Sequence, residues 1–151
     1  MRAIVQRARN ASVIIQDKNV ASFQNGLMVL IGIEQSDDST DADWLIKKIV
    51  NMRIFDDENG VMNESLLVKK YGIIIVSQFT LFASTKKGNR PSYIRAARPD
   101  AAIPLYEYFI QQVQKTAVDC YVGMGEFGAD MQLQFTNDGP VTITLDSKNK
   151  E

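Results

Sequence analysis

The chain has 151 residues, with 45% hydrophobic and 23% charged side chains, which is typical of one soluble globular domain around a single core. Its formal net charge of -1 excludes a strongly basic nucleic-acid binder, so any RNA contact must come from a local patch. The sequence contains no histidine, which excludes Ser-His-Asp and Cys-His catalysis and removes the commonest zinc and iron ligand.

The N-terminal residues Met1 to Arg7 lack the long apolar core of a signal peptide, and no run reaches the ~18 apolar residues of a membrane span. The single Cys120 excludes an intrachain disulfide and fits a reducing compartment. We therefore expect one cytoplasmic domain over residues 1–151, with no membrane partner and with a frayed polar tail at 146–151.

The first third of the chain predicts strands only. The first of them is one bent strand or two segments broken near Asn10, and residues 17–19 give a turn signal. The dipeptide Asn25-Gly26 favours a tight hairpin turn, so we expect an antiparallel meander. The expected strands are residues 3–9, 11–16, 20–23 and 27–33.

A helix is predicted after the polar loop at residues 36–41, which ends in residues suited to capping. Its apolar positions follow the spacing of a helix with one buried face, so it should cover a sheet. Those positions are Ala42, Leu45, Ile46, Ile49 and Val50. The acidic residues at 56–60 lack the ligand spacing of a calcium loop, and Asn59-Gly60 marks a solvated hairpin tip.

The run Gly72 to Val76 predicts a strand buried on both faces. It continues into Ser77, Gln78, Phe79 and Thr80, where hydroxyl and carboxamide groups replace the apolar residues of a structural strand. Buried polar groups need partners, so this point indicates a site. The alternative is a strand end whose hydroxyls bond to their own backbone.

A basic loop follows the central strand. Five cationic side chains fall within thirteen residues of an otherwise slightly acidic chain, namely Lys86, Lys87, Arg90, Arg95 and Arg98. Tyr93 adds an aromatic face on which a base can stack. The loop is either a solvated connection or a contact for RNA or phosphate.

The last third predicts a second helix from Asp100, although Pro104 indicates that its regular part begins later or bends. Cys120 is expected as a buried thiol in a strand at 119–122. The glycine-rich residues 123–130 lack the lysine of a nucleotide-phosphate loop, but they allow close approach to a substrate or partner. Strands are then expected at residues 131–135 and 141–145, joined by a turn at 137–140.

Four blocks of sequence carry a family resemblance. They are Ser77-Gln78-Phe79-Thr80-Leu81, Lys87-Gly88-Asn89-Arg90-Pro91-Ser92, Phe127-Gly128-Ala129-Asp130-Met131 and Asn137-Asp138-Gly139-Pro140-Val141-Thr142. In this order and spacing they resemble the D-aminoacyl-tRNA deacylases, also called D-tyrosyl-tRNA deacylases. The likeness covers nearly all of the chain. Two departures are Met124, where the family usually has Thr, and Pro104 near the helix start.

The resemblance implies an α+β fold, with antiparallel sheets in a barrel-like or layered core and two main helices outside. It also implies a homodimeric hydrolase that cleaves the ester between a D-amino acid, or glycine, and the 3′-terminal adenosine of tRNA. No cofactor, metal or DNA partner is expected. The pair matching Gly139-Pro140 is cis and enters the partner's active site, where it excludes L side chains, and the residue matching Arg7 fixes that pair.

Similar enzymes recruit the 2′-hydroxyl of the terminal adenosine in place of a protein base. We nominate Gln78 and the Phe79 N–H as oxyanion donors, because a positioned donor is worth on the order of 3 kcal/mol. Thr80 lacks an adjacent base, so we expect it to orient groups or relay a proton. Ser77 completes the catalytic set.

The remaining contacts follow from the resemblance for the substrate and from the charge of the basic loop for tRNA. The expected substrate-binding residues also include Phe127, Gly128, Ala129 and Met131, and the expected tRNA contacts are Lys86, Lys87, Arg90 and Arg95. Two other functions stay open: a non-catalytic RNA-binding module that uses the loop from Lys86 to Arg98, and an acyl-hydrolase acting on small free esters.

Overall fold

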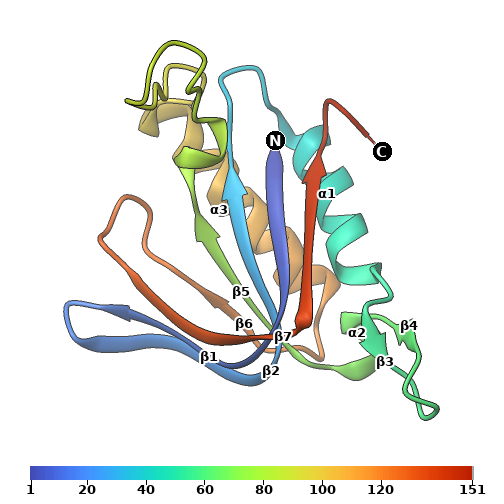
Figure 1. Cartoon of the computed structure of the whole chain (residues 1–151). Helices are drawn as coiled ribbons and strands as arrows, with labels where there is room; N and C mark the ends of the chain where they lie inside the picture. Colours follow the sequence, from blue (N-terminus) through green and yellow to red (C-terminus); the bar gives the residue numbers. More distant parts are fainter. Residues whose placement is uncertain (151) are drawn as a thin grey trace.

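A computed structural model describes residues 1–150, whose main open sheet carries helices on one face (Figure 1). The α+β class is therefore confirmed. The elements are β1 (Arg2–Ile15), β2 (Lys18–Gly32), α1 (Ser39–Asn51), β3 (Phe55–Asp56), β4 (Met62–Glu64), α2 (Leu66–Lys69), β5 (Gly72–Ser77), the 3₁₀ turn η1 (Phe79–Phe82), α3 (Pro99–Thr116), β6 (Val122–Met124) and β7 (Gln132–Asp146).

The main sheet has the order β6-β5-β2-β1-β7, and β3 pairs with β4 in a separate small sheet. Strands β1–β2 and β1–β7 are antiparallel, as expected, but β2–β5 and β5–β6 are parallel. The parallel pairs arise because the chain passes through helices before it returns to the sheet, and such crossovers bring strands back in the same direction. The expected meander is thus limited to the hairpin of β1 and β2.

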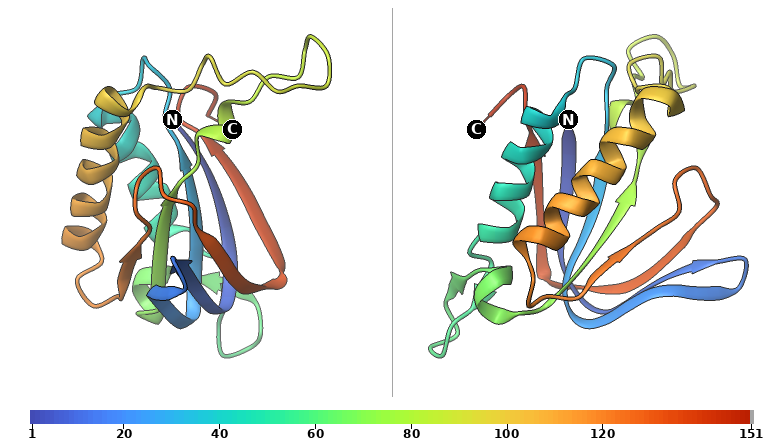
Figure 2. Two further views of the ribbon diagram at one scale, coloured as in Figure 1. Left: turned by 90° about the vertical axis from the view of Figure 1, so that its left-hand side faces the viewer. Right: turned by 180° about the vertical axis from the view of Figure 1, so that it is seen from behind.

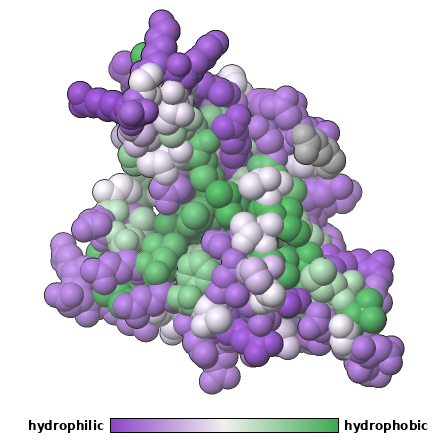
Figure 3. Space-filling view, in the orientation of Figure 1, coloured by the Kyte–Doolittle hydropathy of each residue, from purple (hydrophilic) through white to green (hydrophobic). Residues whose placement is uncertain are grey.

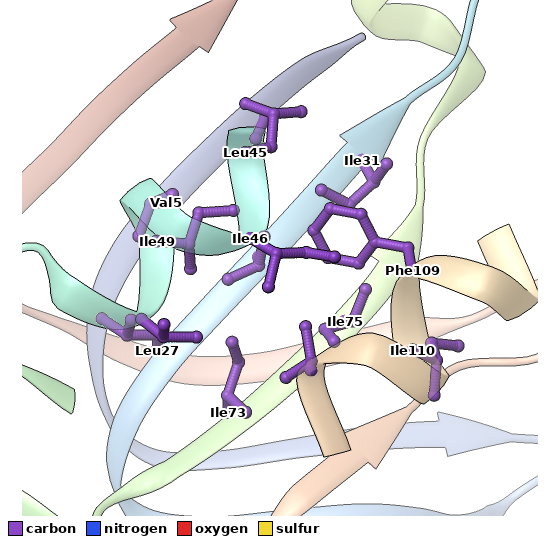
Figure 4. Close-up of a cluster of buried hydrophobic side chains, with 14 of the residues drawn as sticks. Val5, Leu27, Ile31, Leu45, Ile46, Ile49, Ile73, Ile75, Phe109 and Ile110 are labelled. Atoms are coloured by element: carbon purple, nitrogen blue, oxygen red, sulfur yellow. The ribbon is translucent and has the colours of Figure 1, made fainter. Parts of the chain in front are cut away.

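Helices α1 and α3 lie side by side on one face of the sheet (Figure 2). Asp38 caps α1, because its carboxylate accepts the Thr40 N–H at 2.8 Å while its own N–H donates to Asp41 at 3.1 Å. The apolar faces of both helices meet the sheet in the main core, where Ile46 and Phe109 lie close to Ile31 (Figure 4). The predicted amphipathic helix and its buried face are confirmed.

The opposite face of the sheet carries a second apolar cluster that no helix covers (Figure 3). Buried Met28, Ile74 and Val76 form its centre. Leu133 and Phe135 of β7 pack against it and stay partly exposed. The chain itself buries this centre, and the apolar side chains that stay partly exposed around it are the part of this face that can contact another molecule.

The predicted hairpin turn at Asn25-Gly26 is wrong, because both residues lie inside β2. Asn25 pairs with Arg9 of β1, and Gly26 pairs with both Ala8 and Gly72. A Cβ on Gly26 would lie 1.9 Å from the Gly72 carbonyl oxygen, so the glycine permits close contact between two strands. The real turn is at residues 16–17, where both φ angles are positive, the backbone of a two-residue hairpin.

The predicted turn at residues 137–140 is also wrong, because β7 runs through it without interruption. The Asn137 Oδ1 accepts a hydrogen bond from the Val141 N–H at 3.2 Å, so a side-chain oxygen replaces a cross-strand backbone acceptor in this segment. Residues 138–141 of β7 face the single residue Arg7 of β1, and this bulge bends the paired strands. The Gly139-Pro140 bond is cis, as the family resemblance implies.

Three smaller expectations need correction. Helix α3 begins at Pro99, a favoured residue for a first helical position, and it continues through Pro104. Cys120 lies half-buried in the turn before β6, where burial raises the pKa of its thiol. The tail is ordered at Ser147, whose buried Oγ accepts a hydrogen bond from the Met1 amine at 2.6 Å, while Glu151 lies outside the described residues.

In residues 1–150, no helix is long and apolar enough to span a membrane.

Candidate active site

A cleft of about 280 Å³ opens where β2 and β5 end. Ser77, Gln78 and Phe79 form one wall, and the loop of residues 127–131 forms another. We call this the strand-end cleft. Because β2 and β5 are parallel, their carboxyl ends meet at one edge of the sheet, which is the usual place for ligands in such sheets. The structure thus brings together two of the sequence blocks selected for the site.

The Gln78 backbone is fixed, because its N–H donates to the Ile31 carbonyl at 2.7 Å. Its side-chain Nε2 donates to Thr80 Oγ1, so the hydroxyl of Thr80 orients the carboxamide. Phe79 is the first residue of η1, and the first N–H groups of a helix have no acceptor within that helix. This arrangement offers hydrogen-bond donors at the rim of an apolar cleft.

The loop wall of the cleft is held against β5 by α3. The buried hydroxyl of Tyr106 donates to the Ile75 carbonyl at 2.8 Å, and the Gly125 N–H donates to the same carbonyl at 3.0 Å. The Tyr106 ring lies 5.8 Å from the ring of Phe127. Burial raises the pKa of Tyr106, so this hydroxyl stays protonated and remains a donor. Within the loop, Gly128 adopts a φ of 77°, which glycine allows at little cost.

Tyr106 is a site-supporting residue that the sequence did not single out. No local pattern pointed to it, because its hydroxyl partner is 31 residues away in sequence. Ala97, Ala102 and Leu133 also line the cleft and gave no signal, because small and apolar residues are common on any buried face.

Arg7 and Gly139-Pro140 lie elsewhere in the chain and do not line the strand-end cleft. The Arg7 guanidinium is nearly buried and donates to the Ile54 carbonyl at 2.8 Å, to Asp56 at 3.1 Å and to the Asp138 carbonyl at 3.2 Å. Its Nη2 lies 3.1 Å from the position of a Cβ on Gly139. Arg7 therefore packs beside this segment, and the predicted site residues fall into two separate groups within one chain.

The basic loop projects beyond the cleft. Its Lys86, Lys87 and Arg90 are exposed, whereas Arg95 is paired with Glu34 at 3.2 Å. The backbones of Ser84 and Ser92 form an antiparallel bridge that closes the loop. Three of the four predicted tRNA-contacting cations are thus exposed without an ion pair among residues 1–150.

A family model described as D-Tyr-tRNA(Tyr) deacylase matches residues 4–146. This chain belongs to that family. It is 57% identical over 151 residues to a D-aminoacyl-tRNA deacylase of Bacteroides fragilis (strain YCH46), with 100% of each chain covered. It is 56% identical over 151 residues to a protein of the same name from Flavobacterium johnsoniae, again with 100% of each covered.

Solved structures resemble this member of the deacylase family throughout. One is named c-Myc DNA Unwinding Element Binding Protein, with a TM-score of 0.91, 39% identity and coverage of 97% of this chain and 98% of that chain. Another is a probable eukaryotic D-amino acid tRNA deacylase, with a TM-score of 0.79 and coverage of 95% and 97%. At 21% identity the second structure supports the fold alone.

The departure at Met124 lies outside the strand-end cleft of this deacylase. Met124 ends β6, pairs with Ile75 and is 40% exposed. It does not line the cleft, whereas Met131 does. The absence of a Thr hydroxyl at position 124 therefore removes no donor from the cleft wall.

Proposed function

We propose that this protein hydrolyses the ester between a D-amino acid, or glycine, and the 3′-terminal adenosine of tRNA, and leaves L-aminoacyl-tRNA intact. The observation that carries the proposal is the Gln78-Phe79 segment at the rim of an apolar cleft, in a member of the deacylase family. The substrate is found where tRNA is charged, so we place the activity in the cytoplasm.

In the reaction, water adds to the ester carbonyl carbon, the bond from that carbon to the 3′-oxygen breaks, and a proton passes to the 3′-oxygen. The free D-amino acid and tRNA are the products. The substrate 2′-hydroxyl takes the place of a protein base, since the sequence has no histidine. The Phe79 N–H and the Gln78 carboxamide stabilise the negative charge on the carbonyl oxygen.

Thr80 acts through Gln78 and not as a nucleophile. Its Oγ1 accepts the Gln78 Nε2 hydrogen, which holds the carboxamide in one orientation. A threonine hydroxyl without an adjacent base is poorly activated, so covalent catalysis through Thr80 has no support. Ser77 lies half-buried beside Gln78 in the same wall and binds the aminoacyl group.

Selection against L-amino acids requires a second copy of the chain. Gly139-Pro140 of one copy enters the strand-end cleft of the other, and its carbonyl groups occupy the space that an L side chain needs. Two observations support this arrangement: the pair lies away from the cleft of its own chain, and apolar side chains lie at the surface of the sheet face opposite the helices (Figure 3). Arg7 keeps the pair in place through Asp138.

Exposed cations of the basic loop bind the tRNA backbone. Lys86, Lys87 and Arg90 are free to reach phosphates, and Arg95 joins them if tRNA displaces Glu34. The protein then recognises the end of the tRNA by its position and charge, while the cleft recognises the aminoacyl group.

The activity is tested with D-Tyr-tRNA and L-Tyr-tRNA under identical conditions. Release of tyrosine from the D substrate alone is expected, and Gln78→Ala should slow it on the order of 100-fold to 1,000-fold without weakening tRNA binding. Equal hydrolysis of both substrates, or of neither, would overturn the proposal. Hydrolysis of free D-amino-acid esters at the same rate would favour the small-ester hydrolase.

The shared site is tested with mixed dimers of a Gln78→Ala chain and a Gly139→Ala chain. A Cβ on Gly139 would lie 2.9 Å from Val141 Cγ2, at a φ of 118°, so this variant displaces the pair. The Gly139→Ala homodimer should accept L-Tyr-tRNA. The mixed dimer should reject it, because its intact cleft receives an intact Gly139-Pro140 from the partner. L hydrolysis by the mixed dimer would show that the pair acts within its own chain.

A further inference from the structure

An aromatic pair joins the basic loop to the segment that carries Gln78 and Phe79. The rings of Phe79 and Tyr93 have centroids 4.9 Å apart and planes at 77°, an edge-to-face geometry that aromatic pairs favour. Phe79 is 56% exposed, so its ring stands at the surface beside the cleft. The side chain that follows the oxyanion donor Gln78 is thus supported by a residue of the loop.

Tyr93 itself is held on both sides. On its N-terminal side, Ser84 and Ser92 exchange backbone hydrogen bonds of 2.8 and 2.9 Å. On its C-terminal side, the Ala96 N–H donates to the Tyr93 carbonyl at 3.0 Å. The next residue, Ala97, donates to the Ile33 carbonyl at 2.9 Å, just beyond β2. The Tyr93 ring therefore occupies a position set by the folded sheet and by the closed loop.

A second contact joins the same two segments. The Arg95 guanidinium lies 5.4 Å from the centre of the Phe82 ring, and Phe82 is the buried last residue of η1. Tyr93 and Arg95 thus contact the first and last residues of the turn that carries Phe79 and Thr80. A displacement of the loop would be transmitted to this turn.

We propose that Tyr93 is a positioning residue for the deacylation reaction. Its ring holds Phe79, and thereby the Phe79 N–H, where the developing oxyanion needs a donor. The inference rests on the proposed function, because it requires that N–H to act on the ester carbonyl. It gives the loop two roles: its cations bind tRNA, and its aromatic residue sets the geometry of the cleft.

The neighbouring residue supplies a matched control. Ile94 is 93% exposed and follows Tyr93 in the same loop. If the loop acts only by binding tRNA, truncation of either side chain should change tRNA affinity and leave chemistry alone. If Tyr93 positions Phe79, only its truncation should slow the chemical step.

The experiment is single-turnover hydrolysis of D-Tyr-tRNA over a range of enzyme concentrations, which separates the maximal rate from the half-saturating concentration. Tyr93→Ala should lower the maximal rate on the order of 10-fold to 100-fold, because small displacements of a catalytic group cost this much. Its half-saturating concentration should hardly change. Tyr93→Phe keeps the ring and should restore the rate, and Ile94→Ala should match the wild type.

Thermal unfolding and circular dichroism establish that each variant is folded, and Tyr93→Leu provides an apolar side chain without an aromatic edge if the alanine variant is unstable. A normal maximal rate in folded Tyr93→Ala or Tyr93→Leu would overturn the inference while leaving the deacylase function intact. Failure of the wild-type protein to hydrolyse D-Tyr-tRNA would instead overturn the proposed function. Equal losses in the Tyr93 and Ile94 variants would reduce the loop to a binding surface.

Discussion

Two groups of polar residues lie at the same end of the sheet and differ in how their hydrogen bonds are satisfied. Arg2 pairs with Gly32 and Ser77 pairs with Ile31, so the start of β1 and the strand-end cleft belong to one edge. At the start of β1, the Met1 amine donates to Asp37 and to Ser147 at 2.6 Å each. We call this group, together with Asp41 and Lys148, the N-terminal cluster.

In the N-terminal cluster, each charge meets an opposite charge from the same chain. The Asp37 side chain is fully buried, and Lys148 donates to Asp41 at 2.7 Å. In the strand-end cleft, by contrast, Phe79 begins a helical turn and directs its N–H away from any intrahelical acceptor. This difference indicates that buried polar groups with partners in the same chain stabilise the fold, whereas donors that face a cleft are available to bind a ligand.

The largest effect is expected from breaking the N-terminal cluster. Asp37→Asn removes a charge that is fully buried and 2.6 Å from the Met1 amine, which leaves that cation without its ion-pair partner. Loss of one member of a buried pair costs about 3 to 5 kcal/mol. Urea unfolding should show this loss in the free energy of unfolding. The deacylation rate of the folded fraction should stay normal.

The control is Asp17→Asn, which removes an equal charge from an exposed turn. Asp17 has a φ of 63°, a conformation that asparagine also tolerates. Its free energy of unfolding should change by no more than about 0.5 kcal/mol. A similar loss in both variants would mean that net charge, and not the buried pair, sets the difference.

The converse effect is expected at the strand-end cleft. Among residues 1–150, the Gln78 side chain donates a hydrogen bond only to Thr80. Gln78→Ala should therefore hardly change the free energy of unfolding. The maximal rate should fall on the order of 100-fold to 1,000-fold, as for other oxyanion donors. Rate assays and urea unfolding on one preparation check both statements. A Gln78→Ala protein that loses stability but not rate would erase the distinction between the two groups.

Sequence patterns found the elements whose signals are local. The helix of residues 39–51 and its capping followed from apolar spacing and from a polar loop, and both are confirmed. The turns predicted at Asn25-Gly26 and at residues 137–140 are wrong. Each segment lies within a long strand, β2 or β7, that pairs with β1 both before and after it. Tertiary pairing decided against the local preference, and each segment became a bend within a long strand.

The site was predictable in parts and not as an assembly. The polar end of β5 and the glycine-rich loop were visible as separate segments, and the structure places them in one cleft. The sequence could not predict that Arg7 and Gly139-Pro140 lie apart from this cleft within one chain, because their positions depend on which strands bend and pair. The role of Tyr106 likewise depends on a carbonyl in a distant strand.

A smaller effect is expected from the acidic side of the N-terminal cluster. Burial alone would raise the pKa of Asp41, but hydrogen bonds from Lys148, Ser147 and the Asp38 N–H lower it to about 2. A carboxyl group with a depressed folded-state pKa stabilises the protein above its ordinary pKa of 3.8, and this contribution disappears as the pH falls toward 2. The shift corresponds to about 2 kcal/mol.

Urea unfolding at a series of pH values between 2 and 7 checks this dependence. Asp41→Asn should lower the free energy of unfolding near neutral pH and flatten its decline across the acidic range, since an amide does not titrate. An equally steep acidic decline in Asp41→Asn would assign the effect to other carboxylates. The hydrogen bonds of Gln78, Phe79 and Thr80 should show no matching dependence, because these three residues carry no titratable group in this range.

The smallest effect per residue is expected for the exposed cations, which belong to neither group. Lys86, Lys87 and Arg90 make no ion pair among residues 1–150, so their truncation should leave both stability and the maximal rate unchanged. Removal of each phosphate-binding cation should reduce the salt dependence of tRNA binding by roughly one unit of the logarithmic slope. Filter binding of tRNA to each alanine variant at several salt concentrations measures that slope.

The control is Lys18→Ala, which removes an exposed cation at the start of β2 and should keep the wild-type slope. Equal slopes in all variants would remove the basic loop from the tRNA interface and leave the cleft alone to recognise the substrate.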